Sequence, residues 1–568
     1  MALALIALFL GMILEMIGPY LIKIAIDRYM IGEIENWAER ISGIELMAFF
    51  YLGTLFLRFI TGYIDTYMMT LLAQRVMHDM RMGIFSHLQK LAMRFFDRNP
   101  VGRLMTRVTN DVEVLNEMLT GGIIQTIGDL FLMVGLIFWL LYLNWYLALV
   151  AFSIIPVMVF ITTIYRPRIR LLYRMIREKI SEINVNMNEN LSGISVVQIF
   201  NREDRNFKRF EGINQEYLDT NLRAIFLDSL FYPGIQALST ISVSMIIWYG
   251  GRFVVQDVIP LGTLVAFIYY VQMFFRPIMD IGMQYGVMQR AMASCERIFT
   301  LLDEGYEIES PIHPVPLKEV KGEIEFRGVS FAYDEENWVL KNVSFHVKPG
   351  EKVAIVGATG AGKTSTIRLL SRFYEFQKGE ILIDGVDIRQ INLYTLRKNI
   401  GVVLQEFHVF TGTIEENIRL GEEGLPFERV KAAAEYVNAD KFIEKLPRKY
   451  QEEMKERGST LSTGQKQLLA FARVLVFDPK IIILDEATSN VDTETEILIQ
   501  DALKKLLEGR TALIIAHRLS TIQHVDRIIV FHKGEIKEVG THQELLAKGG
   551  IYYKLYQLQF KDQEIFVG

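Results

Sequence analysis

A glycine-rich segment carries the clearest candidate chemistry of this chain. Residues 357–364 read Gly-Ala-Thr-Gly-Ala-Gly-Lys-Thr, directly after the apolar run Lys352–Val356 and before an expected helix at Ser365–Phe373. In that context, successive backbone N–H groups and the helix N-terminus form a cup for phosphate groups. The pattern therefore predicts a nucleotide-phosphate loop made of Gly357, Ala358, Thr359, Gly360, Ala361, Gly362, Lys363, Thr364 and Ser365.

The last residues of this loop suit a nucleotide with a metal ion. Lys363 would supply a positive charge to the outer phosphates, and the Thr364 hydroxyl is a ligand that Mg²⁺ accepts. The loop therefore predicts ATP and Mg²⁺ as the cofactors.

A second apolar run, Lys480–Leu484, ends in the carboxylates Asp485 and Glu486. A strand that ends in this way is typical of metal-assisted hydrolysis. Asp485 would hold Mg²⁺, and Glu486 would act as the general base toward the attacking water. Without the glycine-rich loop the pair would be interpreted as ordinary surface acids; with the loop, the catalytic interpretation is favoured.

Three further side chains follow or precede expected strands of the same region. His517 follows Ala512–Ala516 and would hydrogen-bond the transferring phosphate, although a lone histidine is more often structural. Gln405 follows Ile400–Leu404, and its amide would sense Mg²⁺ and the water. Tyr333 would stack on adenine, and a half-buried strand tyrosine is the alternative.

The first half of the chain holds six apolar segments, each long enough to cross a bilayer core of about 30 Å as a helix. The third and fourth are joined by little more than Asn144 and Trp145, which predicts a tight helical hairpin. They lie near Ala2–Ile26, Leu46–Leu72, Ile123–Leu143, Tyr146–Tyr165, Ala224–Tyr249 and Leu264–Tyr285.

The stretches between some of these segments also have helical periodicity. Residues 74–96 and 168–217 contain few glycines and almost no prolines, so we expect the membrane helices to continue well into the cytoplasm. We expect the two hairpins to turn near Arg107–Leu115 and near Phe200–Phe210.

Lysine and arginine are concentrated in two regions, 75–115 and 166–212, whereas the opposite loops carry only Arg28, Arg40 and Arg252. This asymmetry places both long loops in the cytoplasm. An even number of spans then leaves the nucleotide domain and both chain ends there. Because nothing resembles an organelle-targeting segment, we expect a multi-pass protein of the plasma (inner) membrane.

Several ionisable residues fall within or near the apolar segments. Charge inside a bilayer is costly, so such residues usually face partners or a water-filled cavity. They predict either a translocation pathway or structural pairs, and both alternatives stay open for Glu15, Arg58, Asp65, Asp129 and Asp228.

Length and charge agree with this division. The chain has 568 residues, 51% of them hydrophobic, and a formal net charge of −5. That length predicts several domains, and the charge argues against a nucleic-acid partner. Three prolines near residues 311–316 break any continuing helix. We therefore expect a transmembrane domain at 1–302, a linker at 303–322 and a nucleotide-binding domain at 323–568.

Together, these residues resemble the ATP-binding cassette (ABC) superfamily. The segment Leu461-Ser462-Thr463-Gly464-Gln465 is similar to its signature motif, which implies that Ser462, Gly464, Gln465 and, from the D-loop Ser489–Asp492, Asp492 contact ATP. In the same way Tyr333 resembles the A-loop, Gly357–Thr364 the Walker A motif, Gln405 the Q-loop, Ile481–Glu486 the Walker B motif and His517 the switch histidine.

The membrane half resembles that of ABC exporters. Phe95-Phe96-Asp97, Gly102-Arg103-Leu104 and Thr109-Asn110-Asp111-Val112 are similar to the first intracellular loop of exporters, and Glu456-Arg457-Gly458 to a segment that contacts such loops. Here Met1 opens directly in the first span, where exporters usually have a preceding cytoplasmic segment, so we expect a truncated or misassigned start.

The resemblance implies a half-transporter: an all-α six-helix transmembrane domain followed by an α/β P-loop NTPase domain. Two such subunits would share ATP sites, each completed by the signature of its partner. The expected activity is ATP-driven export of hydrophobic or amphipathic, drug- or lipid-like substrates across the lipid bilayer by alternating access. The alternative is an ATP-gated or regulatory subunit, and the presence of Glu486 and His517 favours turnover.

Two departures from the family pattern concern the dimer. Thr463 replaces a glycine of the usual signature, and a β-branched residue restricts the backbone where the loop must lie close to the partner's γ-phosphate. Asn490 stands where alanine is common. This pattern resembles one half of a heterodimeric exporter; a homodimer that tolerates threonine is the alternative, because Ser462 and Gly464 are retained.

Overall fold

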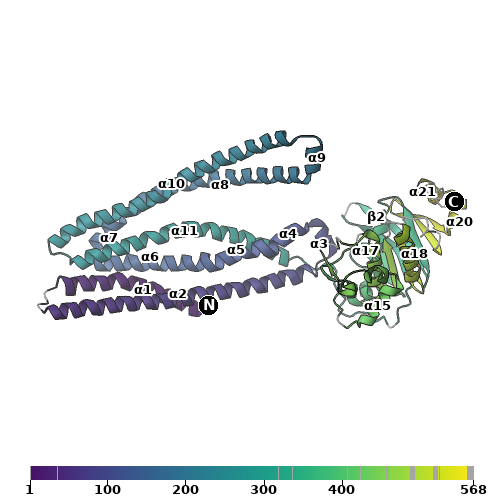
Figure 1. Cartoon of the computed structure of the whole chain (residues 1–568), viewed down its shortest axis with the longest axis horizontal. Coiled ribbons are helices and arrows are strands. Elements are labelled where there is room, and N and C mark those ends of the chain that lie inside the picture. The colour runs from purple at the N-terminus through teal and green to yellow at the C-terminus, as the bar shows by residue number, and fades with distance from the viewer. Residues whose placement is uncertain are drawn as a thin grey trace. The chain divides into compact units, whose positions relative to one another are not determined.

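The computed structural model describes residues 2–32, 34, 36–317, 319–334, 337–405, 407–422, 424–455, 458, 460–485, 493–515, 522 and 525–559. The chain forms two compact units, Met1–Ser86 with Leu104–Asp303, and His87–Arg103 with Glu304–Gly568. The first unit consists of long helices, and the second contains all the strands (Figure 1).

The first unit contains six helical stretches that are long and apolar enough to cross a membrane, which confirms the six expected spans within the described residues. The stretches are Ala2–Met30, Trp37–Leu88, Val101–Leu143, Trp145–Ser192, Glu203–Val255 and Leu261–Ile278. Their elements are α1 (Ala2–Ile24), η1 (Ala25–Met30), α2 (Trp37–Leu88), α4 (Val101–Thr106), η2 (Arg107–Asp111), α5 (Val112–Glu117), η3 (Met118–Gly122), α6 (Ile123–Leu143), α7 (Trp145–Phe152), α8 (Ile155–Ser192), α10 (Glu203–Val255) and α11 (Leu261–Leu302).

The third and fourth spans form the expected tight hairpin. Helix α6 ends at Leu143 and α7 begins at Trp145, and Asn144 between them has an extended backbone. Its side-chain oxygen accepts the backbone N–H of Leu147 at 3.0 Å. An asparagine N-cap satisfies a donor that the first turn of a helix leaves free, and this explains how one residue suffices for the turn.

The first hairpin tip differs from our expectation. It lies at residues 89–100, where the short helix α3 (Met93–Arg98) stands between α2 and α4, and Arg107–Leu115 is helical. Helical periodicity continues through this region, so the pattern alone did not locate the break. The second tip contains the short helix α9 (Ile194–Ile199) and a turn at residues 200–202, where α10 has not yet begun, and this turn overlaps the expected Phe200–Phe210.

Several charges in the spans have partners on neighbouring helices. Arg58 pairs with Glu15 at 2.8 Å. The hydroxyls of Tyr165 and Tyr173 donate to the two carboxylate oxygens of Asp228 at 2.5 and 2.9 Å, which joins α8 to α10. For these residues the structure supports the structural alternative.

The second unit is built on a six-stranded sheet of order β12-β11-β3-β10-β9-β6, in which all strands except β12 run parallel. The central strands are apolar almost throughout, because other elements cover both faces of this sheet. The strands are β12 (Glu535–Gly540), β11 (Arg527–His532), β3 (Lys352–Gly357), β10 (Thr511–Ile515), β9 (Ile481–Asp485) and β6 (Ile400–Val403).

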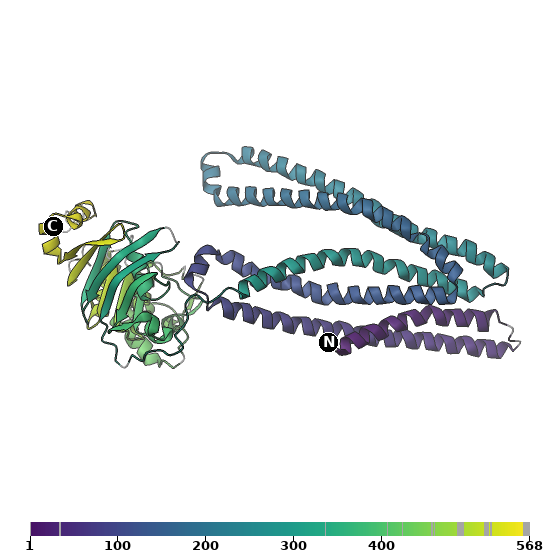
Figure 2. The ribbon, with the colours of Figure 1, turned by 180° about the vertical axis from the view of Figure 1, so that it is seen from behind.

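A four-stranded antiparallel sheet, β2-β1-β4-β5, packs in the same unit (Figure 2). Its strands are β2 (Trp338–Val347), β1 (Ile324–Ala332), β4 (Lys378–Ile383) and β5 (Val386–Asp387). The remaining elements are α12 (Lys363–Leu370), η4 (Ile388–Gln390), α13 (Leu393–Lys398), β7 (Gly412–Thr413), α14 (Ile414–Arg419), α15 (Phe427–Tyr436), α16 (Asp440–Ile443), η5 (Lys449–Gln451), β8 (Glu453–Met454), α17 (Thr463–Leu475), α18 (Thr493–Leu507), α20 (His542–Lys548) and α21 (Ile551–Gln559).

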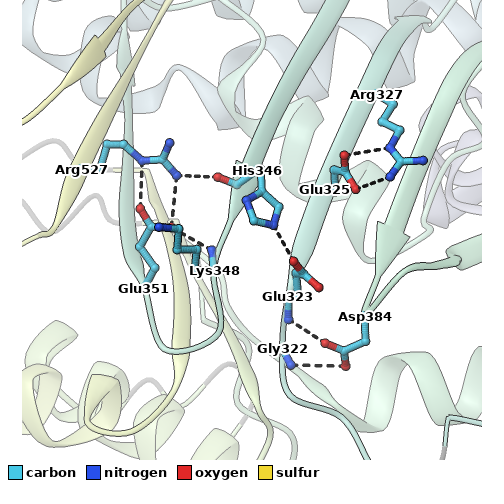
Figure 3. A network of polar contacts seen from close by, with 9 residues as sticks. All are labelled: Gly322, Glu323, Glu325, Arg327, His346, Lys348, Glu351, Asp384 and Arg527. Carbon is cyan, nitrogen blue, oxygen red and sulfur yellow. Dashed lines mark hydrogen bonds and ion pairs between the residues drawn. The ribbon is translucent and has the colours of Figure 1, made fainter.

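A polar network fixes the start of β1 (Figure 3). The Asp384 carboxylate accepts the backbone N–H groups of Lys321, Gly322 and Glu323 at 2.9, 3.4 and 2.9 Å. In the same region, the guanidinium of Arg527 binds both carboxylate oxygens of Glu351 at 2.9 and 3.1 Å (Figure 3). These contacts anchor the point where the irregular segment after α11 enters the sheet.

Candidate functional site

The parallel sheet brings the predicted motifs to one edge. Ile515 of β10 lies level with Ile355 of β3 on one side and with Asp485 of β9 on the other. Leu484 in turn lies level with Val403 of β6. Adjacent strands lie about 4.8 Å apart, so the glycine-rich loop after β3, the carboxylate at the end of β9 and the segment after β6 meet at the carboxyl edge.

The glycine-rich loop has the geometry of a phosphate cradle. Gly362 is left-handed, with φ +102°, and α12 begins at the next residue, Lys363. A Cβ on Gly362 would lie 2.5 Å from the Leu340 side chain. The loop therefore packs closely against β2 while it turns its backbone toward the helix N-terminus, as anion binding requires.

The ammonium group of Lys363 is folded onto the loop. Its Nζ donates to the carbonyl oxygens of Gly357 and Ala358 at 2.7 and 3.0 Å, and the residue is 7% exposed. Burial lowers the pKa of Lys363 below its ordinary value, and the nearby Asp485 carboxylate opposes that shift. Phosphate oxygens would replace the two carbonyls as acceptors and favour the charged form.

The donor set at this edge fits Mg²⁺. Thr364 in α12, the Asp485 carboxylate and the amide of Gln405, an exposed residue after β6, are all oxygen donors. Among the described residues, no group of three or more His, Cys, Asp or Glu could hold a metal ion by itself. This fits Mg²⁺ bound through few protein ligands together with phosphate oxygens.

Tyr333 lies beside α12. Its hydroxyl is 3.0 Å from the Ser365 hydroxyl, and Arg368 donates to it at 3.4 Å. Its ring has edge contacts with Phe331 and Tyr374, whose centroids are 4.7 and 5.1 Å away. The residue is half-buried at the end of β1, so it lies next to the phosphate loop, where an adenine ring would need it.

The signature segment begins a helix. Ser462 is the N-cap of α17, its hydroxyl accepts the N–H of Gln465 at 3.2 Å, and the Gln465 side chain accepts the N–H of Ser462 at 3.0 Å. Thr463 is the first helical residue and is exposed, and Gly464 is buried. Thr463 does not lie at positive φ, so its helical backbone accommodates a β-branched residue. Its side chain adds bulk at the N-terminus of α17, and the predicted effect on a partner's γ-phosphate stays a prediction.

Several predicted residues lie outside the described part of the chain. These are Glu486, Asp492 and His517, together with Asn490 and the pair Glu456-Arg457. Their roles stay predictions from the sequence.

Sequence reasoning missed the surroundings of Tyr333. Tyr374 is 4% exposed and donates its hydroxyl to Asp97, and Arg94 donates to the carbonyl oxygen of Tyr333 at 3.0 Å. No spacing rule connects residues that are more than 230 positions apart, so no signal in the sequence could have identified these contacts.

The fold and the site define a P-loop nucleotide-binding unit joined to a membrane helix bundle. Residues 1–278 match the family model described as the ABC transporter transmembrane region, and residues 340–489 match the model described as ABC transporter. The chain belongs to the ABC transporter family, with the transmembrane region and the ATPase in one polypeptide. It is a membrane protein that hydrolyses ATP, with its nucleotide domain on the cytoplasmic side.

Three relatives illustrate the similarity. An uncharacterized ABC transporter ATP-binding protein, YknV, of Bacillus subtilis is 43% identical over 492 residues, which cover 87% of this chain and 82% of that protein. A probable multidrug resistance ABC transporter protein, YheH, of the same organism is 39% identical over 92% of this chain and 78% of its own length. An ATP-dependent lipid A-core flippase of Syntrophus aciditrophicus is 36% identical over 89% of this chain and 84% of its own length.

Proposed function

We propose that the protein is an exporter that moves hydrophobic or amphipathic, drug- or lipid-like molecules across the plasma membrane by alternating access. The observation that carries this proposal is the joining of six membrane-spanning stretches and a P-loop ATPase in one chain. Relatives named for multidrug resistance and for lipid A-core transport support the class of cargo.

At the nucleotide site, each residue has a proposed role. The loop backbone and Lys363 bind the phosphates, and Thr364, Gln405 and Asp485 hold Mg²⁺, which would neutralise phosphate charge. Glu486, which follows Asp485 in the sequence, takes a proton from the attacking water, and His517 donates a hydrogen bond to the transferring phosphate. Tyr333 stacks on the adenine.

The test combines hydrolysis with movement of cargo. The purified chain in proteoliposomes should hydrolyse ATP and move a fluorescent phospholipid or a cationic amphiphilic dye, and Glu486→Gln should abolish both while ATP binding remains. ATP hydrolysis without movement of any such probe would support the gated or regulatory alternative instead. Transport that persists in Glu486→Gln would contradict the assigned base.

We also propose that the working unit is a dimer in which the signature of each subunit completes the ATP site of the other, with a different ABC half-transporter as the favoured partner. The exposed side chain of Thr463, beside the N-cap Ser462, supports this proposal. Its bulk lies at the N-terminus of α17, where the γ-phosphate of a nucleotide held by the partner would approach.

A substitution separates the two kinds of dimer. If threonine weakens the site that it completes, Thr463→Gly should raise the ATPase activity of the chain purified alone by at least several-fold, and Thr460→Gly should not. Full activity of the unmodified chain alone would instead establish a homodimer that tolerates threonine. Co-purification with a distinct ABC subunit would support the heterodimer.

A further inference from the structure

A continuous set of contacts leads from helix α3 to the helix of the phosphate loop. It begins at Asp97, whose carboxylate accepts the hydroxyl of Tyr374. Burial, reinforced by this carboxylate, raises the pKa of Tyr374 above its ordinary value. The phenol is therefore a protonated donor at any pH at which the protein works. Both residues belong to the same compact unit.

Tyr374 in turn contacts Tyr333. The two rings are nearly perpendicular, at 89°, with centroids 5.1 Å apart. The guanidinium of Arg368 lies 5.9 Å from the Tyr374 ring centroid and also donates to the Tyr333 hydroxyl. The far end of Tyr333 reaches Ser365 in α12. The Tyr333 ring is thus held between the sheet, α12 and a tyrosine that α3 orients.

Helix α3 also holds the backbone of Tyr333. Arg94 donates to the Tyr333 carbonyl oxygen at 3.0 Å and pairs with Glu307 at 3.2 Å. The residue that carries the stacking ring is therefore fixed at its backbone and at its ring by the same short helix.

We propose that Asp97 and Tyr374 are positioning residues for the adenine-stacking ring of Tyr333, and that they set how much the base contributes to nucleotide affinity. The inference rests on the proposed function in one respect, the role of Tyr333 as the base platform. A ring that is already held in its stacking orientation loses little conformational entropy when the nucleotide binds. A ring that is free to rotate loses more, and this weakens binding. The phosphates are proposed to bind to the loop backbone and Lys363, so the contribution of the base should fall while that of the phosphates should not.

The test measures equilibrium binding of ATP and of inorganic triphosphate, which has no base, by competition with a fluorescent ATP analogue, on the full chain in nanodiscs. Tyr374→Phe removes one hydroxyl and keeps the ring. We expect the Kd for ATP to rise threefold to tenfold and the Kd for inorganic triphosphate to rise less than twofold. The control Tyr394→Phe alters a tyrosine that is 66% exposed and should change neither value. Lys363→Ala should weaken the binding of both ligands.

Variants of Asp97 show whether it acts through Tyr374. Asp97→Ala should raise the Kd for ATP as much as Tyr374→Phe does, and the double variant should raise it no further. Asp97→Asn keeps an oxygen acceptor, so it should retain most of the affinity for ATP. Additive losses, or an unchanged ratio of the two Kd values in Tyr374→Phe, would overturn the inference. These outcomes are independent of transport, so failure of the exporter proposal would be recognised separately.

Discussion

The ammonium group of Lys363 donates to the carbonyl oxygen of Gly357 at 2.7 Å, within the loop that the same lysine is proposed to serve. In the nucleotide-free protein, a backbone carbonyl of the loop therefore accepts a hydrogen bond from this buried positive charge. Burying an ammonium group without an anion is costly, and a nucleotide removes that cost when its phosphates replace the carbonyls.

This relationship predicts the pH dependence of nucleotide binding. Because burial lowers the pKa of Lys363 from its ordinary value of 10.5, the nucleotide-free protein loses this charge at a lower pH than an ordinary lysine does. Affinity for ATP should therefore fall as pH rises through the lowered pKa. The stability of the nucleotide-free protein should instead rise as pH rises from the lowered pKa toward the ordinary pKa. The reason is that the unfolded state binds this proton more tightly than the folded state does.

Calorimetric titration of ATP between pH 7 and 10 would check this prediction. Lys363→Arg serves as the control, because its charge persists throughout that range. If the affinity for ATP depended on pH in the same way in the two proteins, the lowered pKa of Lys363 would not be the cause.

The glycines of the loop should differ in their tolerance of alanine. A Cβ on Gly357 would lie 2.4 Å from the carbonyl oxygen of Phe531, a backbone atom that cannot move aside, whereas a Cβ on Gly360 would meet nothing within 4 Å. Gly360 has φ +80°, so Gly360→Ala should cost about 1–2 kcal/mol. Gly357→Ala should lower the thermal unfolding midpoint further. Equal unfolding midpoints for the two variants would contradict this prediction, because the backbone at Phe531 would then have moved to make room for the Cβ.

Arg473 should be important for the stability of the nucleotide-binding unit. Its guanidinium donates to the carbonyl oxygens of Asn417 and His408 at 2.8 and 3.0 Å and to the Asn417 side chain at 3.1 Å, and burial lowers its pKa to about 10. Arg473→Met would leave acceptors unsatisfied, each at about 1–3 kcal/mol. We expect a midpoint lower by several degrees.

The matched control for Arg473 is Arg448→Met, whose side chain is 67% exposed. Exposed ion pairs contribute about 0–1 kcal/mol, so this variant should unfold close to the unmodified chain. An equal loss in both variants would contradict a special role for Arg473.

Asp384 should stabilise the start of β1. Its carboxylate accepts three successive backbone N–H groups, of which Figure 3 draws those of Gly322 and Glu323. The φ of Asp384 is +48°. Asp384→Asn keeps an acceptor and a residue that tolerates this φ, so it should lose less stability than Asp384→Ala, for which we expect about 1–3 kcal/mol. Hydrogen exchange at residues 321–323 would measure the loss directly. Unchanged exchange in Asp384→Ala would refute the anchoring role.

Much of the nucleotide unit could be predicted because its signals are local. Buried parallel strands appear as short apolar runs, and the expected runs before Gly357, Gln405, Asp485 and His517 correspond to β3, β6, β9 and β10. The residue types at the strand ends then predicted phosphate, metal and water ligands, and these roles stay predictions.

Other features depended on contacts between distant parts of the chain. The first hairpin turn was expected near Arg107–Leu115 and lies at residues 89–100, since helical periodicity continues through the expected region. The helical backbone of Thr463 was also not predicted, and it follows from the N-cap at Ser462.

The sequence by itself determined that this chain has six membrane spans and a phosphate-binding loop, because apolar length and glycine spacing are properties of contiguous residues. Only the tertiary structure decided which side chains hold Tyr333 and Asp228. Those partners lie on other elements, and their distances depend on how strands register and helices pack.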